Sequence, residues 1–246
     1  MAKITVVGIG PGSLEDMTPR AKRAIEEAIV VAGYTTYIKL IDELIGEREV
    51  IGTGMMQEID RCRMAVETAA KGKDTVVVSS GDSGVYGMAG LVLELLLQRE
   101  AGDRPKFGGV IAGISAVNAA ASILGAPLMH DFAVISLSDL LTPWELIKKR
   151  AKAAAEADFV VALYNPKSKK RVQNIEEIRE IFLGCRAADT PVGIVNHAAR
   201  DAESKTISTL EDFTKEKIDM FSLVIIGNSR TYMKEGYMIT PRGYEV

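Results

Sequence analysis

The chain has 246 residues, of which 47% are hydrophobic and 26% are charged, and its formal net charge is −3. This composition predicts one large or two small packed domains and argues against intrinsic disorder. Because the weak acidic balance gives no electrostatic footprint for duplex nucleic acid, we expect no nucleic-acid partner.

The cysteine count and the apolar stretches limit the class of protein further. Cys62 and Cys185 are too few for a disulfide scaffold or a cysteine zinc site, so we expect reduced thiols and no protein metal site. The longest apolar stretches, such as 90–97, are far shorter than the roughly 20 residues of a membrane span. No signal-peptide pattern follows Lys3. We therefore expect a cytoplasmic protein without a membrane partner.

Apolar runs alternate with helix-period segments along the chain. Continuous runs of this kind indicate strands that are covered on both faces, as in parallel sheets. They lie at 4–7, 29–32, 75–78, 110–112, 159–163, 192–195 and 223–226. Helices are expected at 18–28, 57–71, 87–98, 117–124, 142–156 and 174–183, and an edge element or tail at 231–246. The alternation predicts an α/β fold.

Two of the predicted helices carry start signals. Thr18-Pro19 opens the first, and Thr142-Pro143-Trp144-Glu145 reads as a capping box with proline at the first helical position. Glycine and proline gather in the middle of the chain, between 108 and 127. We place a hinge near 112–115 and predict two α/β domains, 1–113 and 114–246.

The first glycine loop, Gly8-Ile9-Gly10-Pro11-Gly12-Ser13, lies between a predicted strand and a predicted helix. A P-loop would need a lysine at its end, and a dinucleotide fingerprint would need a third glycine where Ser13 stands. Pro11 also lacks the N–H that a phosphate cradle would use. NAD or ATP binding is therefore disfavoured at this loop, and a plain tight turn stays possible.

The second glycine loop, residues 79–87, leaves a strand and enters a helix. Its Asp82 lies between Gly81 and Ser83. Ligands of open α/β sheets bind at the carboxyl ends of strands, so this carboxylate suits a ribose diol or an amino group. Asp82 as a helix cap or turn former is the alternative.

Three further loops follow predicted strands, at 112–116, 162–166 and 193–198. Five loops at strand ends, spread over both halves of the chain, predict a ligand cleft built from both domains.

Taken in order, the five loops resemble the tetrapyrrole methylases, a family of S-adenosylmethionine-dependent enzymes, over the whole chain. The matching residues are 7–12, 80–82 with 86–87, 113–116, 163–165 and 194–196. Five longer stretches resemble the branch that methylates carbon 17 of precorrin-3B or cobalt-precorrin-3B (cobalt-factor III) and contracts the ring. They are 79–88, 162–168, 196–200, 226–229 and 240–244. Ser83 and Ala112 stand where the family often has proline.

The resemblance implies a two-domain α/β fold that binds S-adenosylmethionine in the cleft between the domains. It also implies a homodimer and an anionic tetrapyrrole substrate of cobalamin biosynthesis, in which any cobalt belongs to the substrate. The first loop would face the substrate. The cofactor contacts that it carries over are Pro11, Gly81, Asp82, Val85, Ser115, Ala116, Asn165, Ala198 and, more weakly, Thr240.

A sulfonium methyl donor carries its own activation, so the enzyme would need alignment of the reactants and exclusion of water and no nucleophilic side chain. His130, Asp131 and His197 are candidates for moving protons, and ordinary hydrogen-bonded residues are the alternative. We assign no catalytic residue. Cations for the substrate carboxylates could come from 148–150, Lys167, 169–171, Arg200 and Arg242, although the two basic runs could equally be solvated helix faces.

Two other readings stay open. The chain could be another corrin-ring methylase or the diphthine-synthesis methylase of the same fold. It could also be a non-catalytic nucleotide-binding or regulatory α/β protein, which would turn over no S-adenosylmethionine.

Overall fold

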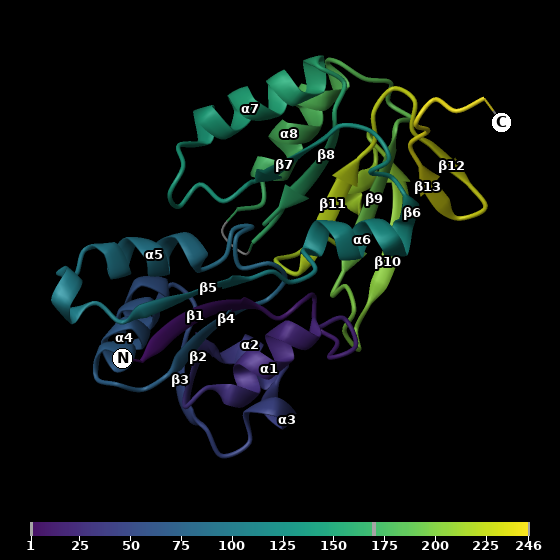
Figure 1. Cartoon of the computed structure of the whole chain (residues 1–246). Helices are drawn as coiled ribbons and strands as arrows, with labels where there is room; N and C mark the ends of the chain where they lie inside the picture. The colour runs from purple at the N-terminus through teal and green to yellow at the C-terminus, as the bar shows by residue number, and fades with distance from the viewer. Residues whose placement is uncertain (1, 169–170, 246) are drawn as a thin grey trace. The chain divides into compact units, whose positions relative to one another are not determined.

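A computed structural model describes residues 2–168 and 171–245 of the chain (Figure 1). The chain divides into two compact units, 1–116 and 117–246, and each is described by itself. The division falls at the end of the third loop identified in the sequence. Within the described residues, no helix has the length and apolar character needed to cross a bilayer.

Unit 1 is built on a five-stranded sheet in which every pair of neighbouring strands is parallel. The strand order β3-β2-β4-β1-β5 brings the carboxyl ends of β4, β1 and β5 next to one another. The strands are β1 (Lys3–Gly8), β2 (Val30–Tyr34), β3 (Glu49–Thr53), β4 (Thr75–Ser79) and β5 (Lys106–Ile111).

Helices cover both faces of this sheet. Ile25 of α1 and Ile45 of α3 pack with Val7 on one face, whereas Cys62 of α4 and Leu96 of α5 pack on the other. Burial on both faces explains why the strands read as continuous apolar runs. The helices are α1 (Pro19–Glu27), α2 (Thr35–Lys39), α3 (Asp42–Ile45), α4 (Glu58–Ala70), α5 (Ala89–Leu97) and the 3-10 turn η1 (Ala101–Asp103).

Unit 2 contains a mixed sheet with the order β10-β9-β11-β8-β7. Only the β7–β8 pair is parallel, so the expectation of parallel sheets is wrong for this half. A strand buried on both faces is apolar whichever way its neighbours run. The strands are β7 (Phe132–Ser136), β8 (Val160–Tyr164), β9 (Pro191–Asn196), β10 (Ser204–Thr209) and β11 (Ser222–Ile226).

A smaller sheet confirms the predicted edge element near the end of the chain. Its strands are β6 (Gly125–Ala126), β12 (Tyr232–Lys234) and β13 (Tyr237–Ile239). The helical elements of unit 2 are α6 (Ala116–Leu124), α7 (Trp144–Glu156), α8 (Asn174–Leu183) and the 3-10 turn η2 (Phe213–Lys215). Ile147 of α7 and Phe182 of α8 share a core with Leu163 and Val224 of the main sheet.

The helix starts are predicted with mixed success. The Thr18 hydroxyl accepts the Ala21 N–H at 3.1 Å and caps α1, as predicted. The Thr142 capping box is wrong, because Pro143 occupies the cap position in an extended conformation and no side chain caps the helix.

Some strands are missing from the prediction. β3, β7 and β10 have polar or exposed positions that interrupt an apolar run. β5 begins at Lys106, earlier than predicted, because Gly108 and Gly109 form an irregularity in its pairing with β1.

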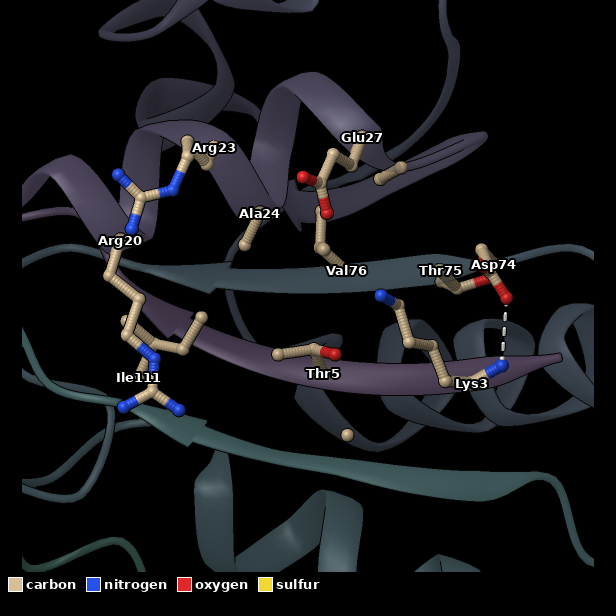
Figure 2. Close-up of a pocket in the computed structure, with 12 residues that line it drawn as sticks. Lys3, Thr5, Arg20, Arg23, Ala24, Glu27, Asp74, Thr75, Val76 and Ile111 are labelled. Carbon is tan, nitrogen blue, oxygen red and sulfur yellow. Dashed lines mark hydrogen bonds between the residues drawn. The ribbon is translucent and has the colours of Figure 1, made fainter.

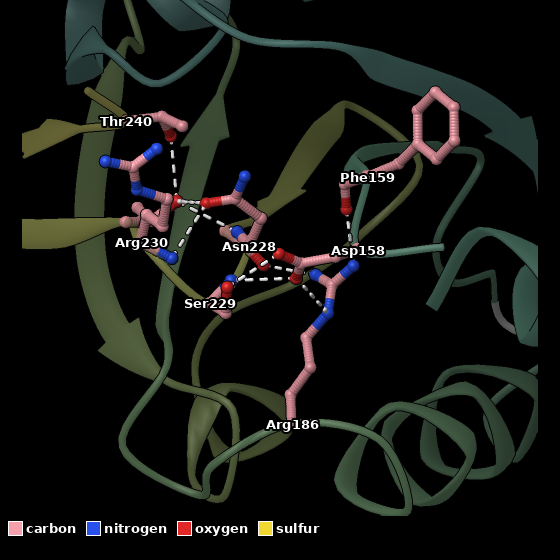
Figure 3. Close-up of polar contacts among 9 residues, drawn as sticks. Asp158, Phe159, Arg186, Asn228, Ser229, Arg230 and Thr240 are labelled. Atoms are coloured by element: carbon pink, nitrogen blue, oxygen red, sulfur yellow. Dashed lines mark hydrogen bonds and ion pairs between the residues drawn. The ribbon is translucent and has the colours of Figure 1, made fainter. Parts of the chain in front are cut away.

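A polar network around Arg186 joins the start of β8 to the end of β11 in the main sheet of unit 2 (Figure 3). Its guanidinium donates to the carbonyls of Phe159, before β8, and Gly227, after β11. Asp158 accepts the Ser229 N–H at 2.9 Å and lies 3.9 Å from Nε of Arg186. Burial lowers the pKa of Arg186, and the Asp158 carboxylate opposes that shift. The loops that follow β8 and β9 lie at the opposite end of these strands.

Candidate functional site

Three glycine-rich loops of unit 1 meet where β1, β4 and β5 end. The Gly10 N–H donates to the Gly81 carbonyl at 3.1 Å, and the Gly81 N–H donates to the Gly10 carbonyl at 2.6 Å. This two-bond bridge joins the first loop directly to the second. The Ile9 N–H also donates to the Ser79 carbonyl at 2.9 Å.

The crossing requires residues without side chains. A Cβ on Gly8 would lie 2.7 Å from the Gly113 nitrogen and 2.7 Å from the Gly81 oxygen. A Cβ on Gly113 would lie 2.7 Å from the carbonyl carbon of Gly8 and closer still to the Gly81 oxygen. No real side chain fits at such distances, so Gly8 and Gly113 must be glycine for steric reasons. Gly81 has room for a Cβ, but its φ of +69° favours glycine.

Asp82 ties the second loop to the third. Its Oδ1 accepts the Gly84 N–H at 2.8 Å, and its Oδ2 accepts the Gly113 N–H at 3.0 Å. The carboxylate is half-buried and retains lone pairs for further donors. The turn-forming role is therefore real, and it leaves capacity for a ligand as well.

The other predicted residues of unit 1 flank this crossing along the chain. Pro11 is buried directly after Gly10, whose φ is +77°. Val85 presents an exposed apolar side chain, and Ser115 and Ala116 are half-buried where α6 begins. The hydroxyl of Ser83 is fully buried and has no partner among the described residues.

In unit 2, Asn165 and Tyr164 lie at the carboxyl end of β8. The Asn165 amide donates to the Ser136 hydroxyl at 3.0 Å, which joins the ends of β8 and β7. The Tyr164 hydroxyl accepts the Val117 N–H at 3.0 Å and holds the first turn of α6. Tyr164 lies inside the motif at 163–165, but no local sequence pattern indicates that its hydroxyl holds α6.

The fifth loop follows the carboxyl end of β9, at the same end of the sheet as Asn165. The His197 N–H donates to the Phe221 carbonyl at 3.1 Å, and the two rings stack with centroids 4.8 Å apart. Ala198 is half-buried between His197 (φ +50°) and Ala199 (φ +55°). Asn165 and Tyr86 also have positive φ, at +50° and +53°. A positive φ places a residue in the left-handed region of backbone conformations, where residues other than glycine are uncommon and often strained. Backbone strain of this kind is frequent at functional sites.

Two predicted groups lie elsewhere in unit 2. His130 and Asp131 directly precede β7, at the opposite end of the strands from Asn165. Thr240 is buried, and its hydroxyl lies 2.7 Å from the Thr231 hydroxyl beside Asn228 (Figure 3). The structure therefore brings His197 to the loops of β8 and β9 and places His130 and Thr240 away from them. No cluster of metal-ligating side chains occurs among residues 2–168 and 171–245.

The basic residues fall into different environments. Arg171 is half-buried and holds neighbouring backbone, so it is no free rim cation. Lys148 pairs with Glu145 at 2.7 Å and Glu177 at 3.3 Å, and the hydrogen bond to Glu145 raises its pKa. Lys149, Arg150 and Arg242 are exposed, Lys167 and Arg200 are half-buried, and Lys169 and Lys170 lie outside the described residues.

A cavity of about 190 Å³ lies in unit 1 between α1 and the sheet (Figure 2). Lys3 and Asp74 line it near the start of β1, and Arg20 and Arg23 line it from α1. None of the nine predicted cofactor contacts lines this cavity. It is therefore separate from the glycine crossing.

Comparison with known proteins places this arrangement in a family. Residues 3–214 match the Tetrapyrrole (Corrin/Porphyrin) Methylases. The chain is 51% identical to a protein of Priestia megaterium named cobalt-factor III methyltransferase, matching 99% of this chain and 45% of that protein. It is 50% identical to a probable cobalt-factor III C(17)-methyltransferase of Salmonella typhimurium, over 98% of this chain and 99% of that protein. The chain thus spans less than half of the first relative and nearly all of the second.

Solved structures of similar fold also include methyltransferases of this family. The methyltransferase CobJ is 35% identical and superposes with a TM-score of 0.90 over 98% of this chain and 100% of that one. A uroporphyrin-III C-methyltransferase of Thermus thermophilus, complexed with S-adenosyl homocysteine, is 23% identical with a TM-score of 0.69, over 92% of this chain and 97% of that one. At that identity the likeness supports the fold alone. The chain belongs to the tetrapyrrole (corrin/porphyrin) methylase family.

Proposed function

We propose that this chain transfers the methyl group of S-adenosylmethionine to carbon 17 of cobalt-factor III, with ring contraction, in cobalamin biosynthesis. The observation that carries the proposal is the likeness, over nearly the whole chain, to the Salmonella protein named for this reaction. A relative from Methanothermobacter thermautotrophicus, 46% identical, has the same name. These names favour the cobalt-loaded substrate over metal-free precorrin-3B.

The site residues inferred from the family motifs remain part of this proposal. Asp82, with its spare lone pairs, suits a hydroxyl or amino group of the cofactor, and Val85 offers an exposed apolar surface. The unpartnered Ser83 hydroxyl adds a buried polar atom beside them. We propose as cofactor contacts Pro11, Gly81, Asp82, Val85, Ser115, Ala116, Asn165, Ala198 and Thr240; Thr240 has the weakest support, because its hydroxyl already bonds to Thr231.

The chemistry asks little of the protein's side chains. S-adenosylmethionine supplies an electrophilic methyl group: the sulfur–methyl bond breaks with its electron pair left on sulfur, and the acceptor carbon supplies the pair of the new bond. The chain binds and orients both reactants and excludes water. His197, at the carboxyl end of β9, is placed better than His130 to accept a proton, and we assign it no catalytic role.

The substrate would be an anionic tetrapyrrole, and any cobalt would enter with it. A homodimer and a cytoplasmic location are further parts of the proposal. Exposed and half-buried cations, such as Arg242 and Lys167, are suited to pair with substrate carboxylates.

The direct test incubates the protein under nitrogen with S-adenosylmethionine and either cobalt-factor III or metal-free precorrin-3B. Mass spectrometry should show one added methyl group on the cobalt-loaded substrate, and S-adenosylhomocysteine should appear in equal amount. Methylation of the metal-free substrate alone would move the assignment to the other route. Methylation of a different ring precursor would favour another corrin-ring methylase, and no turnover with any tetrapyrrole would favour a non-catalytic protein.

A further inference from the structure

The cavity between α1 and the sheet of unit 1 has a buried hydroxyl group on its wall (Figure 2). The group belongs to Thr5 of β1, which is only 5% exposed. Among residues 2–168 and 171–245, the Thr5 hydroxyl has no hydrogen-bond partner. A buried hydroxyl without a partner is unfavourable, so its position on a cavity wall points to a polar occupant.

A β-bulge and two small side chains make room for this cavity. In the pairing of β1 with β5, Gly108 and Gly109 together stand opposite the single residue Thr5. Bulges of this kind are frequent beside sites where a side chain is re-aimed. Ala24 and Ala28 line the cavity from α1. Its volume of about 190 Å³ has room for several water molecules or a small organic molecule, since one water occupies about 30 Å³ of the liquid.

The charged side chains that line the cavity are distributed unevenly along it. Arg20 and Arg23 come from the first half of α1, whereas Glu27 is the last residue of that helix. Asp74 directly precedes β4, and Lys3 is the first residue of β1. Figure 2 shows the two arginines at one end and Lys3 with Asp74 at the other. One end therefore carries two guanidinium groups, and the rest of the cavity carries two carboxylates and one ammonium group.

The charges of α1 oppose its helix dipole. A cation in the first turn and an anion in the last turn are both unfavourable, and α1 has Arg20 at its second position and Glu27 at its last. Within the described part of the chain, neither side chain forms an ion pair or a hydrogen bond, and Arg23 forms none either. Helix stability therefore does not explain these charges, and a ligand that pairs with them would.

The acidic side of the cavity keeps capacity for a donor. Oδ1 of Asp74 accepts the Lys3 N–H at 2.9 Å, and lone pairs remain on both carboxylate oxygens. With Glu27, this side has one net negative charge and suits an ammonium group. Arginine side chains, in contrast, pair with carboxylates through two parallel hydrogen bonds. Arg20 and Glu27 are seven positions apart on α1, which corresponds to about 10 Å along the helix axis.

We propose that this cavity binds a small zwitterion whose carboxylate and ammonium groups stand at opposite ends of a short carbon chain. The carboxylate pairs with Arg20 and Arg23, the ammonium group pairs with Glu27 and Asp74, and the Thr5 hydroxyl bonds to the ligand between them. None of the proposed S-adenosylmethionine contacts lines this cavity. The inference therefore goes beyond the proposed function and does not rest on it.

The first test uses three probes of the same chain length. 6-Aminohexanoate carries both charges, hexanoate lacks the ammonium group, and hexylamine lacks the carboxylate. Binding to the full chain is measured by calorimetry at low salt, where exposed charges are screened least. We expect 6-aminohexanoate to bind at least tenfold more tightly than either other probe. Equal binding of hexanoate would overturn the zwitterion, and no binding of 6-aminohexanoate at millimolar concentration would overturn the site.

The second test assigns each charge of the ligand to its partner. Arg20→Gln and Glu27→Gln should fold normally because both side chains are exposed, and each should weaken 6-aminohexanoate binding at least tenfold. Arg20→Gln should leave hexylamine binding unchanged, and Glu27→Gln should not weaken hexanoate binding. The matched control is Lys22→Gln, which removes an exposed cation of α1 that does not line the cavity and should change no affinity. Similar losses in Arg20→Gln and Lys22→Gln would show an effect of overall charge and overturn the inference.

The Thr5→Val variant tests the buried hydroxyl. Valine keeps the shape of the side chain, and no protein partner loses a hydrogen bond, so the midpoint of thermal unfolding should not fall. The affinity for 6-aminohexanoate should fall several-fold. An unchanged affinity in Thr5→Val would remove the hydroxyl from the site, and an unchanged affinity in Arg20→Gln as well would overturn the site altogether.

Discussion

The carboxylate of Asp82 holds the backbone of Gly113 across the ends of two strands, with Oδ2 3.0 Å from the Gly113 nitrogen. The same side chain closes its own turn through the Gly84 N–H. Asp82 therefore acts on the second and third loops together, although the two residues are 31 positions apart.

Removing this carboxylate should affect folding and ligand binding at the same time. Asp82→Ala leaves two N–H groups without their acceptor, and we expect the free energy of unfolding to fall by about 2 kcal/mol. S-adenosylmethionine should bind at least tenfold more weakly in calorimetry. Asp60→Ala, which removes an exposed carboxylate 3.4 Å from Arg63, should change neither quantity appreciably. Unchanged affinity in Asp82→Ala would remove this residue from the proposed contacts.

The glycine crossing should tolerate no side chain. Gly113→Ala would place a methyl group against the backbone of Gly8 and Gly81, and we expect a loss of about 3 kcal/mol in the free energy of unfolding. Urea denaturation measures this loss. Gly102→Ala is the control, because a Cβ there meets no atom within 4 Å. Similar unfolding midpoints for the two variants would contradict the tight crossing.

The Tyr164 hydroxyl should matter for the start of α6. Tyr164→Phe leaves the Val117 N–H without this acceptor, so we expect about 1 kcal/mol lower stability. Because Ser115 and Ala116 directly precede Val117, the affinity for S-adenosylmethionine should fall two- to fivefold. Tyr244→Phe, at an exposed residue, is the matched control. A stability loss with unaltered affinity would confine Tyr164 to a structural role.

Cys62 predicts a pH dependence at high pH. Burial raises the pKa of its thiol from 9.0 to about 11, and nearby Arg61 opposes the shift. Between these values the unfolded state loses the proton and the folded state keeps it, so the stabilising contribution is complete below pH 9 and is lost as the pH rises toward 11.

The measurement compares thermal unfolding of the wild type and Cys62→Ala from pH 8 to pH 11. The wild type should lose about 2 to 3 kcal/mol more than the variant over this interval, since one pKa unit corresponds to about 1.4 kcal/mol. Parallel curves for the two proteins would show that the thiol titrates alike in both states. The exposed Cys185 serves as an internal comparison, because it should react with a thiol reagent in the folded protein and Cys62 should not.

Local sequence patterns predicted the elements whose signals are local. The helix at 174–183 has the predicted bounds, and Thr18 caps α1 as its position before Pro19 indicates. The predicted capping box of α7 is wrong because a neighbouring residue takes the cap position. Thr142 and Glu145 have the spacing of a capping box, but Pro143 takes the cap position, and Lys148 pairs with Glu145.

The predicted site is supported in the same uneven way. Glycine at positions 8 and 113 can be recognised in the sequence because the backbone crossing has no room for a Cβ, and Gly81 because its φ of +69° favours glycine. No local sequence pattern indicates that Tyr164 and Arg171 bond to distant backbone groups. Their partners, Val117 and Leu137, lie 47 and 34 positions away.

The sequence alone determined the α/β alternation, the family and the loops that follow the strands, because backbone preference and burial leave their mark on neighbouring residues. The tertiary structure decided the directions of the strands in unit 2 and the meeting of the three glycine loops. It also placed His197, and neither His130 nor Thr240, beside the ends of β8 and β9. These depend on which distant strands pair and in which register, and hydrogen bonds between distant backbones leave no periodic signal in the chain.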